Sequence, residues 1–134
     1  PQEMVSSPAD GFVASFTGAN LLHGTARTRE DGLTSIELDG GAVVYSTDRA
    51  EGPVGVVVYP WDVSIGRERH DDSAMNVIEA EIRSVVHIGN RARVRIGPVT
   101  AEVTDASVEK LGLVPGSRVV ASFKATGTRL VPYA

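Results

Sequence analysis

The stretch that decides the fold is residues 91–103, which read Arg91-Ala92-Arg93-Val94-Arg95-Ile96-Gly97-Pro98-Val99-Thr100-Ala101-Glu102-Val103. Polar and apolar residues alternate strictly up to Ile96, which is the pattern of a β-strand with one buried face. Gly97-Pro98 then predicts a turn into a second strand over 99–103. A similar hairpin is predicted upstream, where apolar residues alternate on both sides of Asp39-Gly40-Gly41. We therefore expect strands joined by tight turns.

The remaining segments extend this pattern with further strands and one short helix. Strands are predicted over 54–59, 77–88, 119–124 and 130–131. The helix is predicted to begin at Thr104 or Asp105 and to end at Gly112, with Val108 and Leu111 as its apolar pair. A mainly β chain with one short helix favours a barrel or a sandwich over a doubly wound fold.

The composition excludes several classes of protein. The 134 residues are 42% hydrophobic and 22% charged, and no apolar run is long enough to span a membrane, which fits a globular domain with its own core. The N-terminus lacks the basic and apolar regions of a secretory signal. The absence of cysteine excludes disulfides and thiolate metal sites, and the net charge of −4 argues against broad electrostatic binding of nucleic acid. His70-Asp71-Asp72 is interpreted as a linker rather than a metal site, and no catalytic set is recognised.

A weak internal repeat divides the chain into two halves. Asn20-Leu21-Leu22 opens one set of strands and Asn76-Val77-Ile78 opens another. Residues 57–62 are similar to residues 121–126, and the helix is predicted in the second half alone. The length allows two small units with a boundary in the polar segment 67–73.

Several phrases of the sequence resemble a known family. Residues 1–66 resemble the start of the regulatory tail of ABC importer ATPases, and the phrase that carries the resemblance is residues 8–22, with Pro8, Phe12-Val13-Ala14-Ser15-Phe16 and Asn20-Leu21. Tyr59-Pro60-Trp61-Asp62 resembles a later phrase of the same tail, with two changes. Residues 73–134 resemble a TOBE domain of the molybdate-binding (Mop-like) kind. The motifs that carry this second resemblance are Ser73-Ala74-Met75-Asn76, Ala101-Glu102-Val103-Thr104, Leu111-Gly112-Leu113 with Pro115-Gly116, and Phe123-Lys124-Ala125-Thr126.

The resemblance implies tandem small OB-like β-barrel units, with one short helix in the second. Residues 1–18 would end a linker from an ATPase module, 19–70 would form the first OB-like unit, and 71–134 the TOBE/Mop-like unit. The sequence contains no Gly-x-x-x-x-Gly-Lys-Ser/Thr, so we expect no ATP hydrolysis by these residues. The implied function is regulation and dimerisation of a cytoplasmic transport ATPase subunit held at the inner membrane by its transporter. The implied partners are its own ATPase module, a second copy of the subunit and the transporter's membrane subunits.

The resemblance also implies a binding site for a tetrahedral oxyanion such as molybdate, tungstate or sulfate, and no other cofactor. Such a site needs converging hydroxyl and N–H donors and one or two fixed positive charges. Carried over residue by residue, the donors are Ser73, the backbone N–H of Ala74, Lys124 and Thr126, while Asn76 shapes the loop. We predict an anion held by this set.

Met75 departs from the family pattern, because it stands where related domains have an arginine. Methionine offers neither the positive charge nor the donors of a guanidinium. A charge-assisted hydrogen bond contributes roughly 1.5–3 kcal/mol, so we expect its loss to weaken anion binding by about one to two decades.

The same residues also have plainer interpretations. Lys124 fits an exposed strand lysine, and Ser73 and Asn76 fit a turn that leads into a strand. In that case the chain is a structural or partner-docking tail that binds no anion. A nucleic-acid-binding OB module is a third hypothesis, based on the basic row Arg91, Arg93 and Arg95. No aromatic residue interleaves with that row, which favours a solvated face or a contact with an acidic patch.

Overall fold

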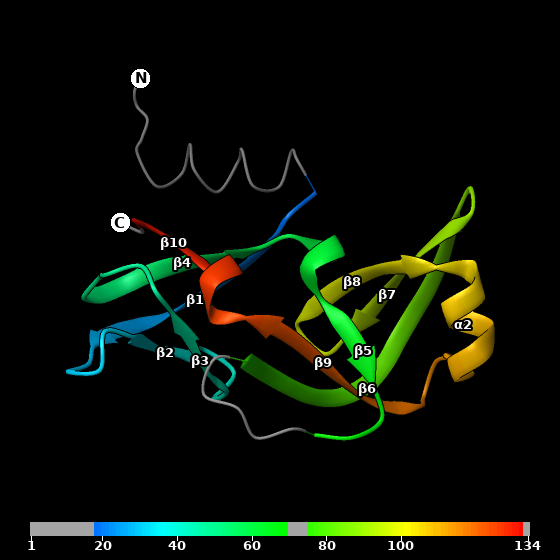
Figure 1. Cartoon of the computed structure of the whole chain (residues 1–134), viewed down its shortest axis with the longest axis horizontal. Coiled ribbons are helices and arrows are strands. Elements are labelled where there is room, and N and C mark those ends of the chain that lie inside the picture. Colours follow the sequence, from blue (N-terminus) through cyan, green and yellow to red (C-terminus); the bar gives the residue numbers. More distant parts are fainter. Residues whose placement is uncertain (1–17, 70–74, 133–134) are drawn as a thin grey trace. The chain divides into compact units, whose positions relative to one another are not determined.

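The computed structural model describes residues 18–69 and 75–132, and these are mostly β-strand (Figure 1). The mainly β class and the single short α-helix predicted from the sequence are confirmed for this part of the chain. The elements are β1 (Asn20–Thr28), β2 (Thr34–Leu38), β3 (Val43–Ser46), β4 (Gly52–Val58), η1 (Pro60–Asp62), β5 (Ser64–Gly66), β6 (Met75–Ile88), β7 (Arg91–Ile96), β8 (Val99–Thr104), α2 (Asp105–Leu111), β9 (Arg118–Lys124), η2 (Ala125–Gly127) and β10 (Arg129–Pro132).

The chain forms two compact units, each built on one five-stranded sheet. Unit 1 comprises Pro1–Val58 and Lys124–Ala134, and unit 2 comprises Tyr59–Phe123. The strand order is β10-β4-β1-β2-β3 in the first sheet and β5-β9-β6-β7-β8 in the second. The two orders are equivalent, because β4 corresponds to β9 and β1 to β6. The last strand of each half is exchanged: β5 follows β4 in the chain but pairs with β9, and β10 follows β9 but pairs with β4 (Figure 1).

This exchange explains why the compact units differ from the predicted division. The sequence was expected to divide between residues 70 and 71, which separates the two repeated series of strands. The compact units instead divide at 58/59 and at 123/124, ahead of each exchanged strand. Pairing across repeats cannot be read from local alternation, since the alternation shows that a strand exists and not which sheet it joins.

The predicted barrels are open sheets in the described residues. The outer strands are β10 and β3 in unit 1 and β5 and β8 in unit 2, and no strand pairing between outer strands is found in 18–69 or 75–132. The turn η2 packs against β3 and η1 against β8, so a turn lies where a closing pair of strands would be. The fold is therefore OB-like without a closed barrel.

In unit 1 the core is formed by buried side chains of β2, β3 and β4. Ile36 pairs with Val44 across the β2–β3 hairpin, and both side chains are fully buried. The turn between these strands uses Gly41 with a φ of 103°, a conformation that only glycine adopts without strain. Val56 and Val58 of β4 complete the buried layer.

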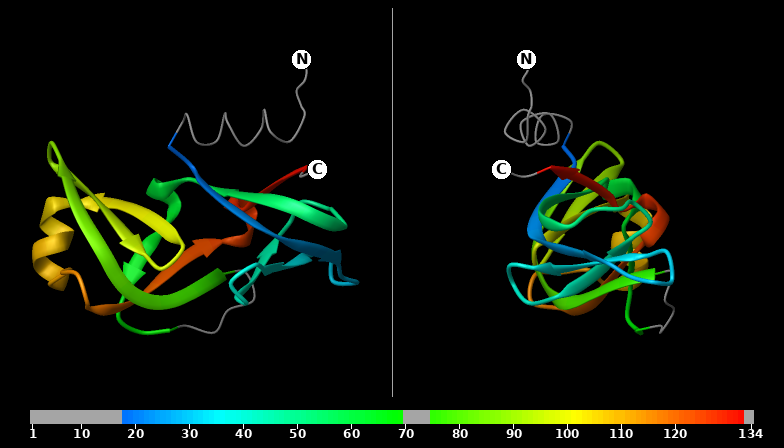
Figure 2. Two further views of the ribbon diagram at one scale, coloured as in Figure 1. Left: turned by 180° about the vertical axis from the view of Figure 1, so that it is seen from behind. Right: turned by 90° about the vertical axis from the view of Figure 1, so that its left-hand side faces the viewer.

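In unit 2 the alternating residues 91–103 form β7 and β8, as predicted. The β6–β7 and β7–β8 turns are both two residues long, because Ile88 pairs with Arg91 and Ile96 with Val99. Figure 2 shows α2 beside the β6–β7 hairpin, and the Asp105 N–H at the start of α2 donates to the Asn90 carbonyl in the turn of that hairpin at 3.1 Å. The largest fully buried side chain of the unit is Phe123 of β9.

The short helix has the ends predicted from the sequence. Thr104 is the N-cap, and its Oγ1 accepts a hydrogen bond from the backbone N–H of Ser107 at 3.1 Å. Gly112 follows the helix with φ 62° and ψ 46°, the left-handed conformation of a glycine C-cap. Arg67 Nη2 donates to the carbonyl oxygen of Leu111 at 2.6 Å and so occupies one of the free carbonyls of the last turn. Among the described residues, no helix has the length and apolar character needed to cross a membrane.

Candidate functional site

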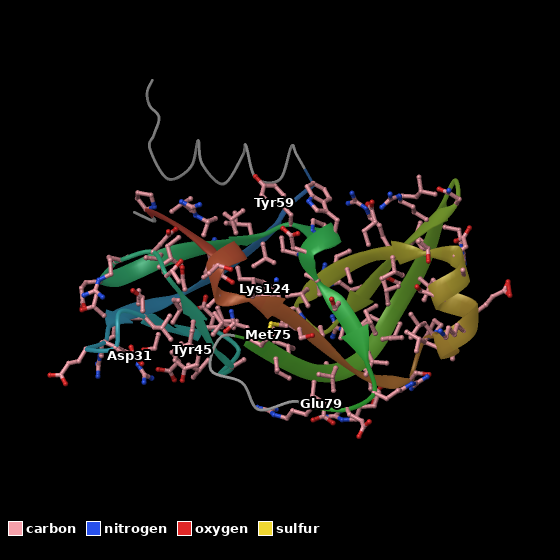
Figure 3. The ribbon with its side chains drawn as sticks, in the orientation of Figure 1. Asp31, Tyr45, Tyr59, Met75, Glu79 and Lys124 are labelled. Atoms are coloured by element: carbon pink, nitrogen blue, oxygen red, sulfur yellow. The ribbon has the colours of Figure 1, made fainter. Side chains whose placement is uncertain are left out.

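Two of the predicted anion donors lie on one turn. Lys124, labelled in Figure 3, is the N-cap of η2. Thr126 is the central residue of η2, and the side chains of both residues are exposed. Ala125 between them is buried, with 2% of its surface exposed. The turn therefore directs one ammonium group and one hydroxyl toward solvent on either side of a buried residue.

Hydrogen bonds within unit 1 fix the backbone of this turn. Thr128 closes it: the Thr128 N–H donates to the Ala125 carbonyl at 3.2 Å, and Thr128 Oγ1 donates to the Lys124 carbonyl at 2.9 Å. Ser46 Oγ of β3 donates in turn to the Thr128 carbonyl. The side chains of Ser46 and Thr128 are fully buried, so the bond from Ser46 Oγ to the Thr128 carbonyl forms away from water.

The strand that follows the turn is held by one carboxylate. Asp48 Oδ2 accepts from Arg129 Nε at 2.9 Å and from the backbone N–H of Leu130 at 3.0 Å. The Asp48 N–H donates to Ser46 Oγ at 3.0 Å, and Thr34 Oγ1 donates to the Asp48 carbonyl at 2.6 Å. Asp48 thus joins the β3 side of unit 1 to the start of β10.

The other predicted site residues are distributed differently. Ser73 and Ala74 lie outside the described residues, and so does the predicted linker His70-Asp71-Asp72. Met75 begins β6 and is partly exposed, whereas Asn76 has only 2% of its surface exposed. Met75 and Asn76 belong to unit 2, while Lys124 and Thr126 belong to unit 1. Lys124 and Thr126 are therefore the two predicted donors that lie together on one described turn.

Sequence reasoning missed that the first half contains the same turn. Tyr59 has φ −79° and ψ 139° as the N-cap of η1, and Lys124 has φ −77° and ψ 143° as the N-cap of η2. Tyr59 therefore corresponds to Lys124, and Trp61 corresponds to Thr126. The predicted similarity between residues 57–62 and 121–126 is shifted by one residue from this match.

The first-half turn carries two aromatic side chains in place of the lysine and the threonine. Tyr59 and Trp61 stack on each other, with ring centroids 5.0 Å apart and planes inclined by 14°. Trp61 has 52% and Tyr59 has 36% of its surface exposed. Neither ring offers a positive charge, so the two equivalent turns differ in chemistry while sharing a backbone.

The basic row on β7 is partly neutralised within unit 2. Glu102 on β8 lies 3.4 Å from Arg91 Nη1 and 3.2 Å from Arg93 Nε. Arg95 Nε donates to the Gly97 carbonyl at 3.0 Å. Within 18–69 and 75–132 no three histidine or acidic side chains gather as a metal site would require.

Comparison with known proteins identifies relatives and a fold neighbour. Residues 72–130 match the TOBE domain family. The chain is 31% identical, over 96% of its length, to the molybdate/tungstate import ATP-binding protein WtpC of Pyrococcus abyssi, of which it spans 37%. It is 35% identical, over 69% of its length, to the molybdenum import ATP-binding protein ModC 1 of Azotobacter vinelandii, of which the match spans 28%.

The fold is similar to that of the cytoplasmic molybdate-binding protein ModG in a crystal form with molybdate bound. The TM-score is 0.72 at 25% identity, and the match covers 84% of this chain and 96% of the ModG chain. The curated relatives are much longer, since the matches span 37% and 28% of them. Together with the predicted phrases from Ser73 onward, these matches confirm the resemblance noted in the sequence. Residues 72–130 thus match a TOBE domain, and the relatives of the chain are named as import ATP-binding proteins for molybdate/tungstate and molybdenum.

Proposed function

We propose that the chain is a regulatory domain that binds a tetrahedral oxyanion of the molybdate, tungstate or sulfate type. Two relatives are named as molybdate/tungstate or molybdenum import ATP-binding proteins. The fold neighbour ModG is named as a molybdate-binding protein. Transport, feedback inhibition and dimerisation of the longer subunit are parts of this proposal.

The observation that carries the proposal is the Lys124–Thr126 turn. An oxyanion is recognised by donors that are fixed in place before it arrives, because ordering them on binding reduces affinity. Lys124 supplies an ammonium with three N–H donors and Thr126 supplies a hydroxyl, on either side of the buried Ala125. Ser73 and the Ala74 N–H are the remaining proposed donors, on the strength of the sequence motif.

Regulation would follow from differential affinity. An anion that binds one arrangement of two tail domains more tightly than another shifts the population toward the first. In a transport ATPase whose nucleotide-binding modules must close on each other, tails that dimerise in one arrangement would permit or prevent that closure. The anion would then report the internal supply of the transported solute.

Calorimetric titration of the chain with molybdate, tungstate and sulfate tests the proposal. We expect binding by the unmodified chain and a loss of about 10- to 100-fold in affinity for Lys124→Ala, as for one charge-assisted hydrogen bond. Lys110→Ala is the matched control, because Lys110 is an exposed lysine at the end of α2 and far in sequence from the turn. Absence of heat with all three anions, or equal losses in both variants, would contradict the proposal.

Met75→Arg tests how complete the site is. An arginine would restore the charge and the fork of donors that related domains have at this position. We expect a gain of about one to two decades in molybdate affinity, read in the same calorimetric titration. No gain would show that Met75 does not border the anion.

A second candidate function is a partner-docking tail without an anion. The exposed Tyr59–Trp61 pair favours it, because Tyr and Trp are enriched where proteins bind each other. The nucleic-acid hypothesis has less support, since Glu102 partly neutralises Arg91 and Arg93. Tyr59→Ala with Trp61→Ala separates docking from anion binding: a docking tail would lose its partner and an anion-binding domain would keep its affinity.

A further inference from the structure

The chain builds the same short turn twice, with the same hydrogen bond closing it each time. In η1 the Val63 N–H donates to the Pro60 carbonyl at 3.2 Å, and in η2 the Thr128 N–H donates to the Ala125 carbonyl at 3.2 Å. The closing residues have similar dihedrals: φ −97° and ψ 122° at Val63, φ −97° and ψ 109° at Thr128. Each closing side chain is buried, with 3% exposed at Val63 and 0% at Thr128.

The two closing residues differ in one functional group. Valine and threonine have nearly the same shape, but only threonine carries a hydroxyl. Because η1 forms with valine, neither the turn nor its burial requires that hydroxyl. A buried hydroxyl must also be hydrogen-bonded to offset its desolvation, so an apolar residue would be the simpler choice here.

The hydroxyl of Thr128 closes the donor turn, and the carbonyl of Thr128 connects that turn to the sheet. Thr128 Oγ1 donates to the Lys124 carbonyl at 2.9 Å, and so fixes the backbone from which the Lys124 side chain starts. Ser46 Oγ donates to the Thr128 carbonyl, and the Asp48 N–H donates to Ser46 Oγ at 3.0 Å. The Thr47 N–H adds a long contact of 3.4 Å to the Ala125 carbonyl. Both ends of the turn are thereby tied to the end of β3 and the residues that follow it.

We infer that Thr128, held by Ser46, is a positioning residue that fixes the Lys124–Thr126 turn in the geometry that receives an anion. This inference rests on the proposed function. Thr128 does not touch the anion: its side chain is fully buried, and it acts through the backbone of Lys124. Fixing the turn in advance lowers the ordering that binding would otherwise require. The equivalent turn with Val63 presents two stacked aromatic side chains and no positive charge, and it has no such buried hydroxyl.

The test compares Thr128→Val with Thr128→Ser in the full chain. Calorimetry with molybdate gives the affinity, and amide hydrogen exchange over residues 125–128 gives the opening of the turn. For Thr128→Val we expect faster exchange and an affinity about threefold to tenfold weaker, as for one neutral hydrogen bond. Thr128→Ser retains the hydroxyl and should lie near the unmodified chain in both measurements.

Val63→Ala is the matched control for stability, because it truncates a buried side chain at the equivalent place in the other turn. It should lower the melting temperature and leave the molybdate affinity unchanged. If Thr128→Val binds molybdate as tightly as the unmodified chain does, or if Val63→Ala weakens binding equally, the inference is overturned. If the unmodified chain binds no anion, the proposed function fails first, and the titration of that chain identifies this outcome separately.

Discussion

One glycine–valine pair on neighbouring strands is reversed between the two units. In unit 1 Gly55 of β4 pairs with Val131 of β10, and in unit 2 Val120 of β9 pairs with Gly66 of β5. The registers make these pairs equivalent, so the large and the small residue have changed strands. In each sheet the pair consists of one glycine and one valine, but on opposite strands. This is expected when packing depends on the combined volume of two neighbouring side chains.

The exchanged strands make this packing a link between the two halves of the sequence. A Cβ on Gly55 would lie 2.9 Å from Val131 Cγ2 and 3.1 Å from Leu21 Cδ1. A Cβ on Gly66 would meet nothing within 4 Å. The first glycine is thus required by a side chain that arrives from the other half, and the second is not.

The largest expected effect on stability comes from placing a valine at position 55 of unit 1 while Val131 is kept. Gly55→Val should overpack against Val131 and Leu21 and lower the free energy of unfolding by about 1–3 kcal/mol. Urea denaturation measures the loss. The double variant Gly55→Val with Val131→Gly copies the arrangement of unit 2 and should recover much of it, whereas Gly66→Ala should change little. A double variant as unstable as Gly55→Val would show that the two pairs are not equivalent.

The helix present in unit 2 alone gives a smaller effect. Thr104→Ala removes the side-chain oxygen that accepts from the Ser107 N–H, and should lower stability by about 1 kcal/mol. Hydrogen exchange should increase in α2 and leave the β1–β2 pairing of unit 1 unaffected. Thr104→Ser keeps the cap and serves as the control. Equal exchange increases in both units would contradict a local role for the cap.

The smallest expected effect is a change of stability with pH in unit 1. The Thr28 hydroxyl and then the Thr28 N–H donate to the Glu51 carboxylate and lower its pKa, and the Leu33 N–H lowers the pKa of Asp31. A carboxyl whose pKa is lower in the folded state adds stability above its unfolded pKa. That stability is lost as the pH falls through the folded pKa. Glu51→Gln should therefore be slightly less stable than the unmodified chain at neutral pH and equal to it in acid, by urea denaturation at each pH. A difference that persists in acid would assign the effect to packing.

The strands, the tight turns and the capped helix were predictable because their signals are local. Alternation over 91–96, the Gly97-Pro98 turn and the Thr104 cap each act within a few residues. The exchange of β5 and β10 was not predictable, since strands of 3 and 4 residues carry no information on which sheet they join. The match between η1 and η2 was shifted by one residue because Tyr59 and Lys124 share a backbone and no side-chain chemistry.

The candidate site was predictable only in part. The motif around Lys124 and Thr126 pointed to an exposed pair of donors, and these two residues do share one turn. Thr128 was missed, because a threonine before a short strand looks like an ordinary strand residue. Its carbonyl accepts a hydrogen bond from Ser46, which is 82 residues away in the sequence, and local patterns do not show that contact.

The bounds of the units also describe an insertion. Unit 2 is one continuous segment, Tyr59–Phe123, which interrupts unit 1 along the chain. The polypeptide therefore enters and leaves the inserted domain by two covalent routes, and a 3₁₀ turn lies beside each crossing. A ligand held at Lys124 would bind at the second of these two crossings, where the chain returns to unit 1.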